Sequence, residues 1–84
     1  MKINLLYFGR PRERLNTSSE IVDVPDNIAT LGDLLDWLRN RGENWAHELA
    51  DNRVRCALNQ EMSKSTARIR AHDEVAIFSP ISGG

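Results

Sequence analysis

Apolar and polar residues alternate along several short segments of the chain, and such alternation is typical of β-strands. We expect strands over residues 2–8, 20–24, 53–58 and 74–78, and a shorter one near 61–63. In the first and the last of the long segments, both faces carry apolar side chains. Strands of this kind belong in the middle of a sheet, or have a second face that contacts a partner.

A period of three to four residues predicts one main helix. Four leucines recur at i, i+3, i+4 and i+7, which places them on a single face of a helix over residues 30–41. Thr30 is a suitable N-cap, and Asp33 three residues later completes a weak capping box. Gly42 is the expected C′ residue of this helix.

The remaining segments connect these elements. Residues 9–19 are polar and predict a loop with turns, whereas Trp45 and the leucine four residues after it predict a short helical turn within 43–52. The order is then β-β-α-β-β-β. It predicts an α+β fold, a mixed sheet of four to five strands with one main helix packed on one face. We expect one domain over residues 1–78 and an extended, flexible tail over 79–84.

The composition argues against some classes of function. The 84 residues include 11 basic and 12 acidic side chains, a net charge of −1, so no overall field favours nucleic acid. The apolar run at the start is too short for a signal-peptide core or a membrane span. We therefore expect a cytoplasmic protein with no membrane partner. The short basic segment over residues 10–14 is expected to be a solvated loop.

The nucleophilic and metal-ligating side chains form no recognisable catalytic set. Cys56 is the only cysteine, and it shares a strand face with Val54 and Leu58, so we expect a buried, unreactive thiol. His47 and His72 stand alone, and no metal site is expected. No glycine-rich loop precedes a helix, so we expect this chain to bind no ATP or other cofactor.

The two-faced strands predict a partner surface. If one face of the first and last strands packs under the helix, then Leu6, Phe8, Ala76 and Phe78 lie together on the opposite face. An uncovered apolar group of this kind usually marks an interaction site. The alternative is that the segment around Trp45, or the tail itself, covers this face.

The last residues suggest where the chemistry takes place. The sequence closes directly behind the last strand, with Pro80 stiffening the connection to Ile81-Ser82-Gly83-Gly84. Because glycine has no Cβ, a Gly-Gly arm can enter a narrow cleft, and the whole arm can reach roughly 20 Å. We expect the reactive group to be the carboxylate of Gly84; the alternative is a frayed tail.

A terminal carboxylate must be activated before it can act as an acyl donor, most simply by adenylation with ATP. Attack by a sulfur donor on the acyl-adenylate leaves a thiocarboxylate, and attack by an amine leaves an amide. Since no ATP site is expected on this chain, a separate enzyme must activate Gly84, and this chain has no active site of its own.

Four stretches of the sequence resemble the small subunit of molybdopterin synthase, a sulfur carrier of the ubiquitin-like β-grasp fold. The resemblance covers the whole length, and the ending is its most specific part. The family usually has Pro-Pro-Val after the phenylalanine, where this chain has Ser79-Pro80-Ile81. The matching stretches are Lys2-Ile3-Asn4-Leu5-Leu6-Tyr7-Phe8-Gly9 followed by Arg12-Glu13, Thr30-Leu31-Gly32-Asp33-Leu34-Leu35, Ala57-Leu58-Asn59-Gln60-Glu61, and Asp73 to Gly84.

This resemblance implies a set of partners and a mechanism. An E1-like adenylyltransferase uses ATP to activate Gly84, and a sulfurtransferase or persulfide donor converts it to the thiocarboxylate. The tail, from Pro80 through Ile81 and Ser82 to Gly83, then inserts into the large synthase subunit within a heterotetramer. There its sulfur goes to cyclic pyranopterin monophosphate and forms the dithiolene of molybdopterin. The same resemblance implies that Phe78 lies in the large-subunit interface.

Three alternatives remain open on the sequence alone. The chain resembles sulfur carriers of other pathways, such as thiamin thiazole or cysteine synthesis, in which only the sulfur acceptor differs. A protein modifier would attach Gly84 to lysines as ubiquitin does. A plain β-grasp interaction module would have an incidental tail.

Overall fold

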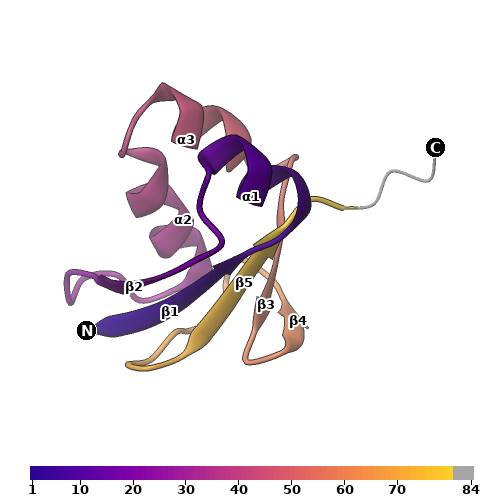
Figure 1. Ribbon diagram of the computed structural model, residues 1–84. Helices are drawn as coiled ribbons and strands as arrows, with labels where there is room; N and C mark the ends of the chain where they lie inside the picture. The colour runs from indigo at the N-terminus through magenta and orange to yellow at the C-terminus, as the bar shows by residue number, and fades with distance from the viewer. Residues whose placement is uncertain (81–84) are drawn as a thin grey trace.

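A computed structural model describes residues 1–80 and shows a five-stranded sheet with three helices on one of its faces (Figure 1). The predicted α+β class, with a mixed sheet and a main helix on one face, is confirmed. The elements are β1 (Lys2–Tyr7), α1 (Gly9–Leu15), β2 (Ser19–Asp23), α2 (Leu31–Arg39), α3 (Glu43–Glu48), β3 (Arg55–Leu58), β4 (Glu61–Ser63) and β5 (Glu74–Phe78).

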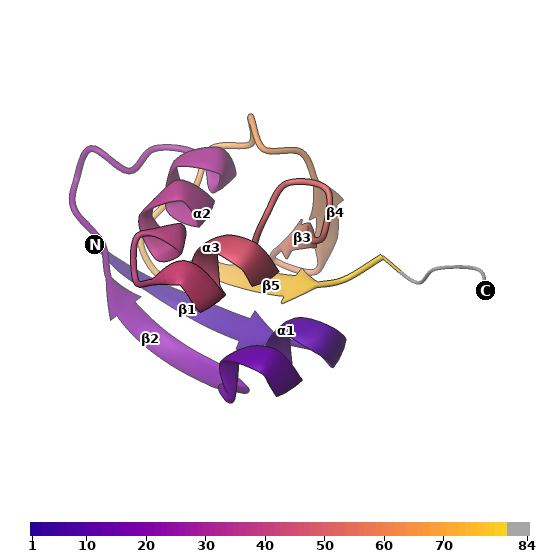
Figure 2. The same ribbon diagram turned by 90° about the horizontal axis from the view of Figure 1, so that it is seen from above.

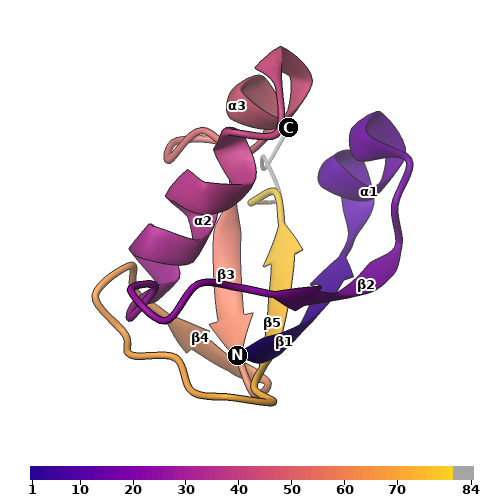
Figure 3. The ribbon, with the colours of Figure 1, turned by 90° about the vertical axis from the view of Figure 1, so that its left-hand side faces the viewer.

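The strands lie in the order β2-β1-β5-β3-β4, so the first and last strands of the chain are neighbours in the middle of the sheet (Figure 3). β1 and β5 run parallel, with Leu5 opposite Val75 and Tyr7 opposite Ile77. The other three pairs are antiparallel. The sheet is therefore mixed, as predicted, and β5 leads the chain out of its centre toward the tail.

The core lies between this sheet and the helices. Strand residues on the helix side are fully buried, as the alternation predicts, and the four leucines of α2 pack on them. Ile69 anchors the irregular connection before β5. The side chains with essentially no exposure include Ile3, Leu5, Tyr7, Leu31, Leu34, Leu38, Leu49, Val75 and Ile77.

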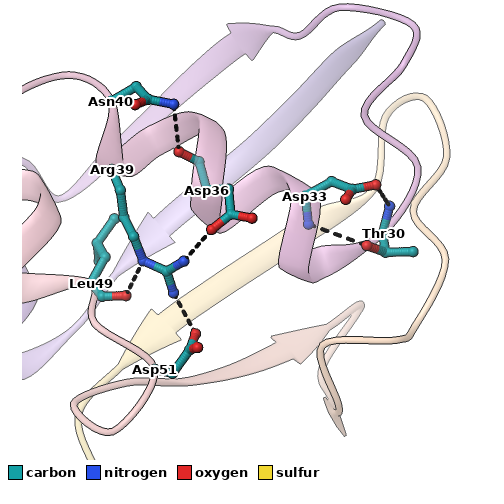
Figure 4. A network of polar contacts seen from close by, with 7 residues as sticks. All are labelled: Thr30, Asp33, Asp36, Arg39, Asn40, Leu49 and Asp51. Carbon is teal, nitrogen blue, oxygen red and sulfur yellow. Dashed lines mark hydrogen bonds and ion pairs between the residues drawn. The ribbon is translucent and has the colours of Figure 1, made fainter.

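The main helix is shorter than predicted. α2 spans Leu31–Arg39, with Thr30 as N-cap and Asn40 as C-cap, instead of residues 30–41. The predicted capping box is present: the Thr30 hydroxyl accepts from the Asp33 N–H at 3.2 Å, and the Asp33 carboxylate accepts from the Thr30 N–H at 3.2 Å (Figure 4). Gly42 is not the C′ residue of α2 but the N-cap of α3, because the chain turns directly into the next helix.

A polar network holds the C-terminal end of α2 against the chain that follows α3 (Figure 4). The Arg39 guanidinium donates to the Leu49 carbonyl oxygen and to the carboxylates of Asp36 and Asp51. The Asn40 side chain donates to the Asp36 carbonyl oxygen. These contacts hold α2 against the segment that connects α3 to β3.

The polar segment over residues 9–19 contains a helix that the sequence pattern did not predict. α1 spans Gly9–Leu15, so the basic stretch is helical and not a loop. Pro11 suits the first turn of a helix, because its fixed φ is helical and its missing N–H has no partner there. Pro11 and Leu15, four residues apart, are the two buried residues of α1.

The other connections agree with the sequence pattern. The short helical turn around Trp45 is α3. Asn59 and Gln60 form the tight turn between β3 and β4. Both residues have positive φ, as a two-residue type I′ hairpin turn requires. No helix within residues 1–80 is both long and apolar enough to cross a membrane.

Candidate functional site

The tail begins at the end of the sheet where β1 and β5 finish side by side. The Phe8 N–H donates to the Ile77 carbonyl oxygen at 2.9 Å, which continues the parallel pairing one residue past β1. Phe8 and Phe78 therefore lie close together where the chain leaves the sheet as Ser79 and Pro80. Pro80 is exposed, whereas Ser79 is half-buried.

α1 borders the start of the tail (Figure 2). Gly9 makes the turn from β1 into α1 with a φ of 61°, a conformation that glycine adopts at little cost. A Cβ added at Gly9 would lie 3.7 Å from the Ser79 hydroxyl oxygen, so this turn lies beside the first tail residue. We call the point after Phe78, where Ser79 and Pro80 leave the sheet, the tail exit. The position of α1 therefore defines one side of the tail exit.

The face of the sheet opposite the helices carries a row of small and apolar side chains. Strand register places Leu6, Ala76, Ala57 and Met62 next to one another across four strands. We call this surface, together with Phe8 and Phe78, the open face. Met62 is 66 % exposed and Phe8 47 % exposed, while Leu6 and Phe78 are half-buried.

Trp45 does not cover the open face. Its ring packs edge-on against the Tyr7 ring at a centroid distance of 5.9 Å, on the helix side of the sheet. The Arg41 guanidinium lies 4.6 Å from the centroid of the same indole and also binds Glu20. The alternative in which the Trp45 segment shields Phe78 is therefore wrong.

The structure brings together the predicted partner-binding residues that it describes. Leu6, Phe8 and Phe78 form one surface at the tail exit, with Pro80 just beyond it. Ile81, Ser82, Gly83 and Gly84 lie outside the described residues, so their predicted roles stay predictions.

Sequence reasoning missed three residues of this surface. Arg55 is opposite Phe78 in the β3–β5 register and is exposed, so it adds a positive charge at the edge of the apolar surface. Ala57 and Met62 extend the surface to β4. The Asn59-Gln60 turn could have predicted that Met62 lies beside Ala57. A two-residue turn sets the register of the two strands, and the register determines which of their residues share a face.

Cys56 is a core residue, as predicted. It is 5 % exposed, and burial raises the pKa of its thiol to about 11, with the Arg39 charge opposing this shift. Nucleophilic cysteines instead need a stabilised, accessible thiolate. Cys56 also lines a pocket of 460 Å³ between α2 and the β3–β4 hairpin, whose rim includes Asp51, Arg55 and Lys64.

The described residues contain no group of three His, Cys, Asp or Glu side chains placed to hold a metal ion. His47 lies near Glu48 on α3, and His72 lies in the loop before β5. The candidate functional site of the described residues is therefore the open face together with the tail exit.

Comparison with known proteins agrees with this geometry. Residues 5–84 match the ThiS family. A molybdopterin synthase sulfur carrier subunit of Mycobacterium tuberculosis is 34 % identical over 87 residues, covering 100 % of this chain and 99 % of the relative. This chain belongs to the ThiS family.

Solved structures show the same fold for this ThiS-family chain. SAMP1 from Haloferax volcanii, a small archaeal modifier protein, superimposes with a TM-score of 0.77 at 30 % identity over the full length of both chains. Its likeness confirms the predicted β-grasp fold. A chain from the complex of subunits 1 and 2 of a molybdopterin-converting factor from Helicobacter pylori shares the fold with a TM-score of 0.66. That match covers 100 % of both chains at 16 % identity.

Proposed function

We propose that this chain is the sulfur carrier subunit of a molybdopterin synthase. The observation that carries the proposal is the position of the open face, which adjoins, through Phe8 and Phe78, the point where the tail leaves the sheet. A partner that binds Leu6, Phe8 and Phe78 receives the tail directly beside its docking surface. Full-length similarity to sulfur carrier subunits of molybdopterin synthases supports the same assignment.

The chemistry takes place at the Gly84 carboxylate. An E1-like enzyme transfers AMP from ATP to this carboxylate and releases pyrophosphate. The terminal sulfur of a sulfurtransferase persulfide, or of another persulfide donor, then attacks the acyl carbon, and AMP leaves as an acyl disulfide forms. A thiol of the donor reduces this disulfide, which releases the thiocarboxylate and leaves the donor as a disulfide. The chain itself contributes binding and orientation, and its partners supply ATP and catalysis.

The large synthase subunit is the proposed acceptor of the tail, with cyclic pyranopterin monophosphate as the substrate. A thiocarboxylate carries one sulfur atom and a dithiolene contains two, so each product molecule requires two deliveries. Reversible docking of the carrier follows from this stoichiometry, because a spent carrier must be exchanged for a loaded one. We further propose that the complex is a heterotetramer and that it acts in the cytoplasm.

The side chains of the open face indicate the chemistry of the partner surface that would bind it. Its centre is apolar, and Arg55 stands beside Phe78 at the tail exit. A complementary surface places apolar side chains against Leu6, Phe8 and Phe78 and a carboxylate against Arg55. Aromatic residues in the centre of such a patch, with charge at the rim, are the usual arrangement of a protein interface.

Intact-mass measurement tests the proposal. The chain is incubated with ATP, its E1-like enzyme and a sulfur donor, and a gain of about 16 Da on the C-terminal peptide is expected, since one oxygen is replaced by sulfur. A chain lacking Gly84 serves as the matched control and gains no mass. An unchanged mass with a demonstrably active enzyme contradicts the proposal.

A protein modifier is the second candidate, because SAMP1 matches this chain over its full length. In that role the activated Gly84 forms an amide with a lysine. Adducts of higher mass that resist hydrolysis in cell extracts, and that are lost on deletion of Gly84, favour the modifier. Restoration of molybdopterin formation by the thiocarboxylated chain and the large subunit favours the sulfur carrier.

A further inference from the structure

β2 is one of the two edge strands of the sheet, and its outer side faces solvent (Figure 2). The bonding pattern with β1 determines which of its backbone groups point outward. The Tyr7 N–H donates to the Ser18 carbonyl oxygen at 2.9 Å, and the Val24 N–H donates to the Met1 carbonyl oxygen at 2.8 Å. Hydrogen-bonded pairs alternate in an antiparallel ladder, so residues 18, 20, 22 and 24 bond to β1.

It follows that the N–H and C=O groups of Ser19, Ile21 and Asp23 point away from the sheet. Hydrogen bonds among the described residues outside regular elements use none of these six groups. An edge of this kind is a template for another strand unless charge, proline or a bulge blocks it. β2 has the sequence Ser-Glu-Ile-Val-Asp, without lysine or proline, and its register with β1 is continuous.

The middle of this edge is apolar. Ile21 is 69 % exposed, more than either other large exposed hydrophobic residue of the described chain. Its side chain lies on the same side of the sheet as the open face but outside it, two strands away from β5. The acidic residues of β2 are engaged within the molecule, since Glu20 accepts hydrogen bonds from Tyr7 and Arg41, and Asp23 accepts one from the Met1 ammonium group.

We propose that β2 pairs with β2 of a second copy of this chain, antiparallel and centred on Ile21. In this register each Ile21 lies opposite Ile21 of the second copy and exchanges both backbone hydrogen bonds with it. Ser19 lies opposite Asp23, which places a hydroxyl donor beside a carboxylate acceptor. Glu20 lies opposite Val22, and its carboxylate is already neutralised by Arg41.

The register is therefore self-complementary: Ile21 faces Ile21, Ser19 faces Asp23, and no two like charges lie directly opposite each other, which would be unfavourable. The resulting sheet is continuous through both copies. β1 separates β2 from β5, so Phe8, Phe78 and the tail exit of each copy stay accessible. The inference does not depend on the proposed sulfur-carrier function.

Pairing of two five-residue strands buries much less surface than a standard interface of about 1,600 Å². We therefore expect a weak dimer, with a dissociation constant on the order of 0.1–1 mM. A dimer of this strength dissociates when the chain is dilute and forms where it is concentrated.

Sedimentation equilibrium over a concentration series up to about 1 mM tests the pairing. The wild-type weight-average mass is expected to rise from that of the monomer toward twice that value. Ile21→Lys should remain monomeric, because a charge at the centre of the edge disfavours strand pairing. The matched control is Met62→Lys, a substitution of similar exposure on the opposite edge strand, and it should associate like the wild type.

Amide hydrogen exchange locates the contact. The Ile21 and Asp23 amides of the wild type should become protected as the concentration rises, while the Glu61 to Ser63 amides should not. A wild-type chain that stays monomeric throughout overturns the proposal, as does association of Ile21→Lys with wild-type affinity. Protection of the β2 amides only after addition of the large synthase subunit would assign the edge to that partner and likewise overturn self-pairing.

Discussion

Arg10 and Glu48 form an ion pair that ties α1 to α3, with 3.0 Å between the Arg10 Nε and the Glu48 Oε1. Glu48 is the one charged residue in the buried part of the described chain, at 4 % exposure, whereas Arg10 is 45 % exposed. The Asn44 side chain adds a second link by donating to the Arg14 carbonyl oxygen at 2.9 Å. Since α1 borders the tail exit, this pair helps to set where the tail begins.

Arg10→Met should therefore destabilise the fold. It leaves the Glu48 carboxylate buried without its partner, and we expect a loss of about 2 kcal/mol, between the values for exposed and for buried pairs. Urea unfolding measures this loss. The double variant Arg10→Met, Glu48→Met should recover most of it, because a buried ion pair is readily replaced by apolar contacts. A double variant as unstable as the single one would show that the charge itself is not the cause.

Phe78→Asp should weaken binding to the large synthase subunit and leave the fold intact. A carboxylate in the centre of a desolvated interface costs about 3 kcal/mol, or roughly 100-fold in the dissociation constant. Calorimetric titration with the large subunit measures the change. Ile21→Asp is the control, since it places the same charge on the same side of the sheet but far from the tail exit. Loss of cooperative unfolding in Phe78→Asp would show instead that Phe78 belongs to the core.

The buried thiol predicts a dependence of stability on pH. The pKa of Cys56 is raised by burial from 9.0 to about 11, so the unfolded chain releases this proton at lower pH than the folded chain. Between these values the unfolded state binds fewer protons, and the free energy of unfolding falls as the pH rises, by about 2 kcal/mol.

Cys56→Ala should lose this part of the pH dependence. Unfolding curves of both proteins between about pH 8 and pH 11 provide the comparison. Tyr7, whose pKa is also raised by burial and by Glu20, contributes equally to both proteins and cancels in the difference. Parallel curves for the two proteins would contradict the assignment.

The capping box at the start of α2 predicts a fourth result. Thr30→Ala removes the oxygen that accepts the Asp33 N–H, and it should cost about 1 kcal/mol of stability. Thr30→Ser keeps that oxygen and should cost much less. Thermal unfolding of the two variants side by side measures the difference, and equal losses would mean that the threonine methyl group is what matters.

The elements with a strong period were predictable from the sequence. Four leucines at helical spacing behind a threonine cap define α2, and the alternation in β1 and β5 defines both their buried and their open faces. These patterns are local, and the residues that they predict to be buried are buried in the structure. The side of the sheet that carries Phe8 and Phe78 is therefore predictable from the sequence alone.

The features that the sequence did not reveal are of two kinds. α1 is short and polar, and only Pro11 and Leu15 mark its buried side, so its period is too brief to be distinguished from a loop. Contacts between distant residues are the second kind. Arg10 and Glu48 are 38 residues apart, and Met62 joins the open face only through the hairpin register. Such contacts depend on the complete topology.

The parallel pairing of β1 with β5 also affects how the chain folds. β5 is the last of the five strands in sequence, yet it lies at the centre of the sheet, between β1 and β3. During synthesis the β1–β2 pair and the β3–β4 hairpin can form, but they cannot join until β5 has left the ribosome. Folding that waits for such a distant contact is slow compared with local pairing. A chain interrupted before Glu74 would lack both its central strand and its tail, so the tail is displayed only by molecules able to complete the fold.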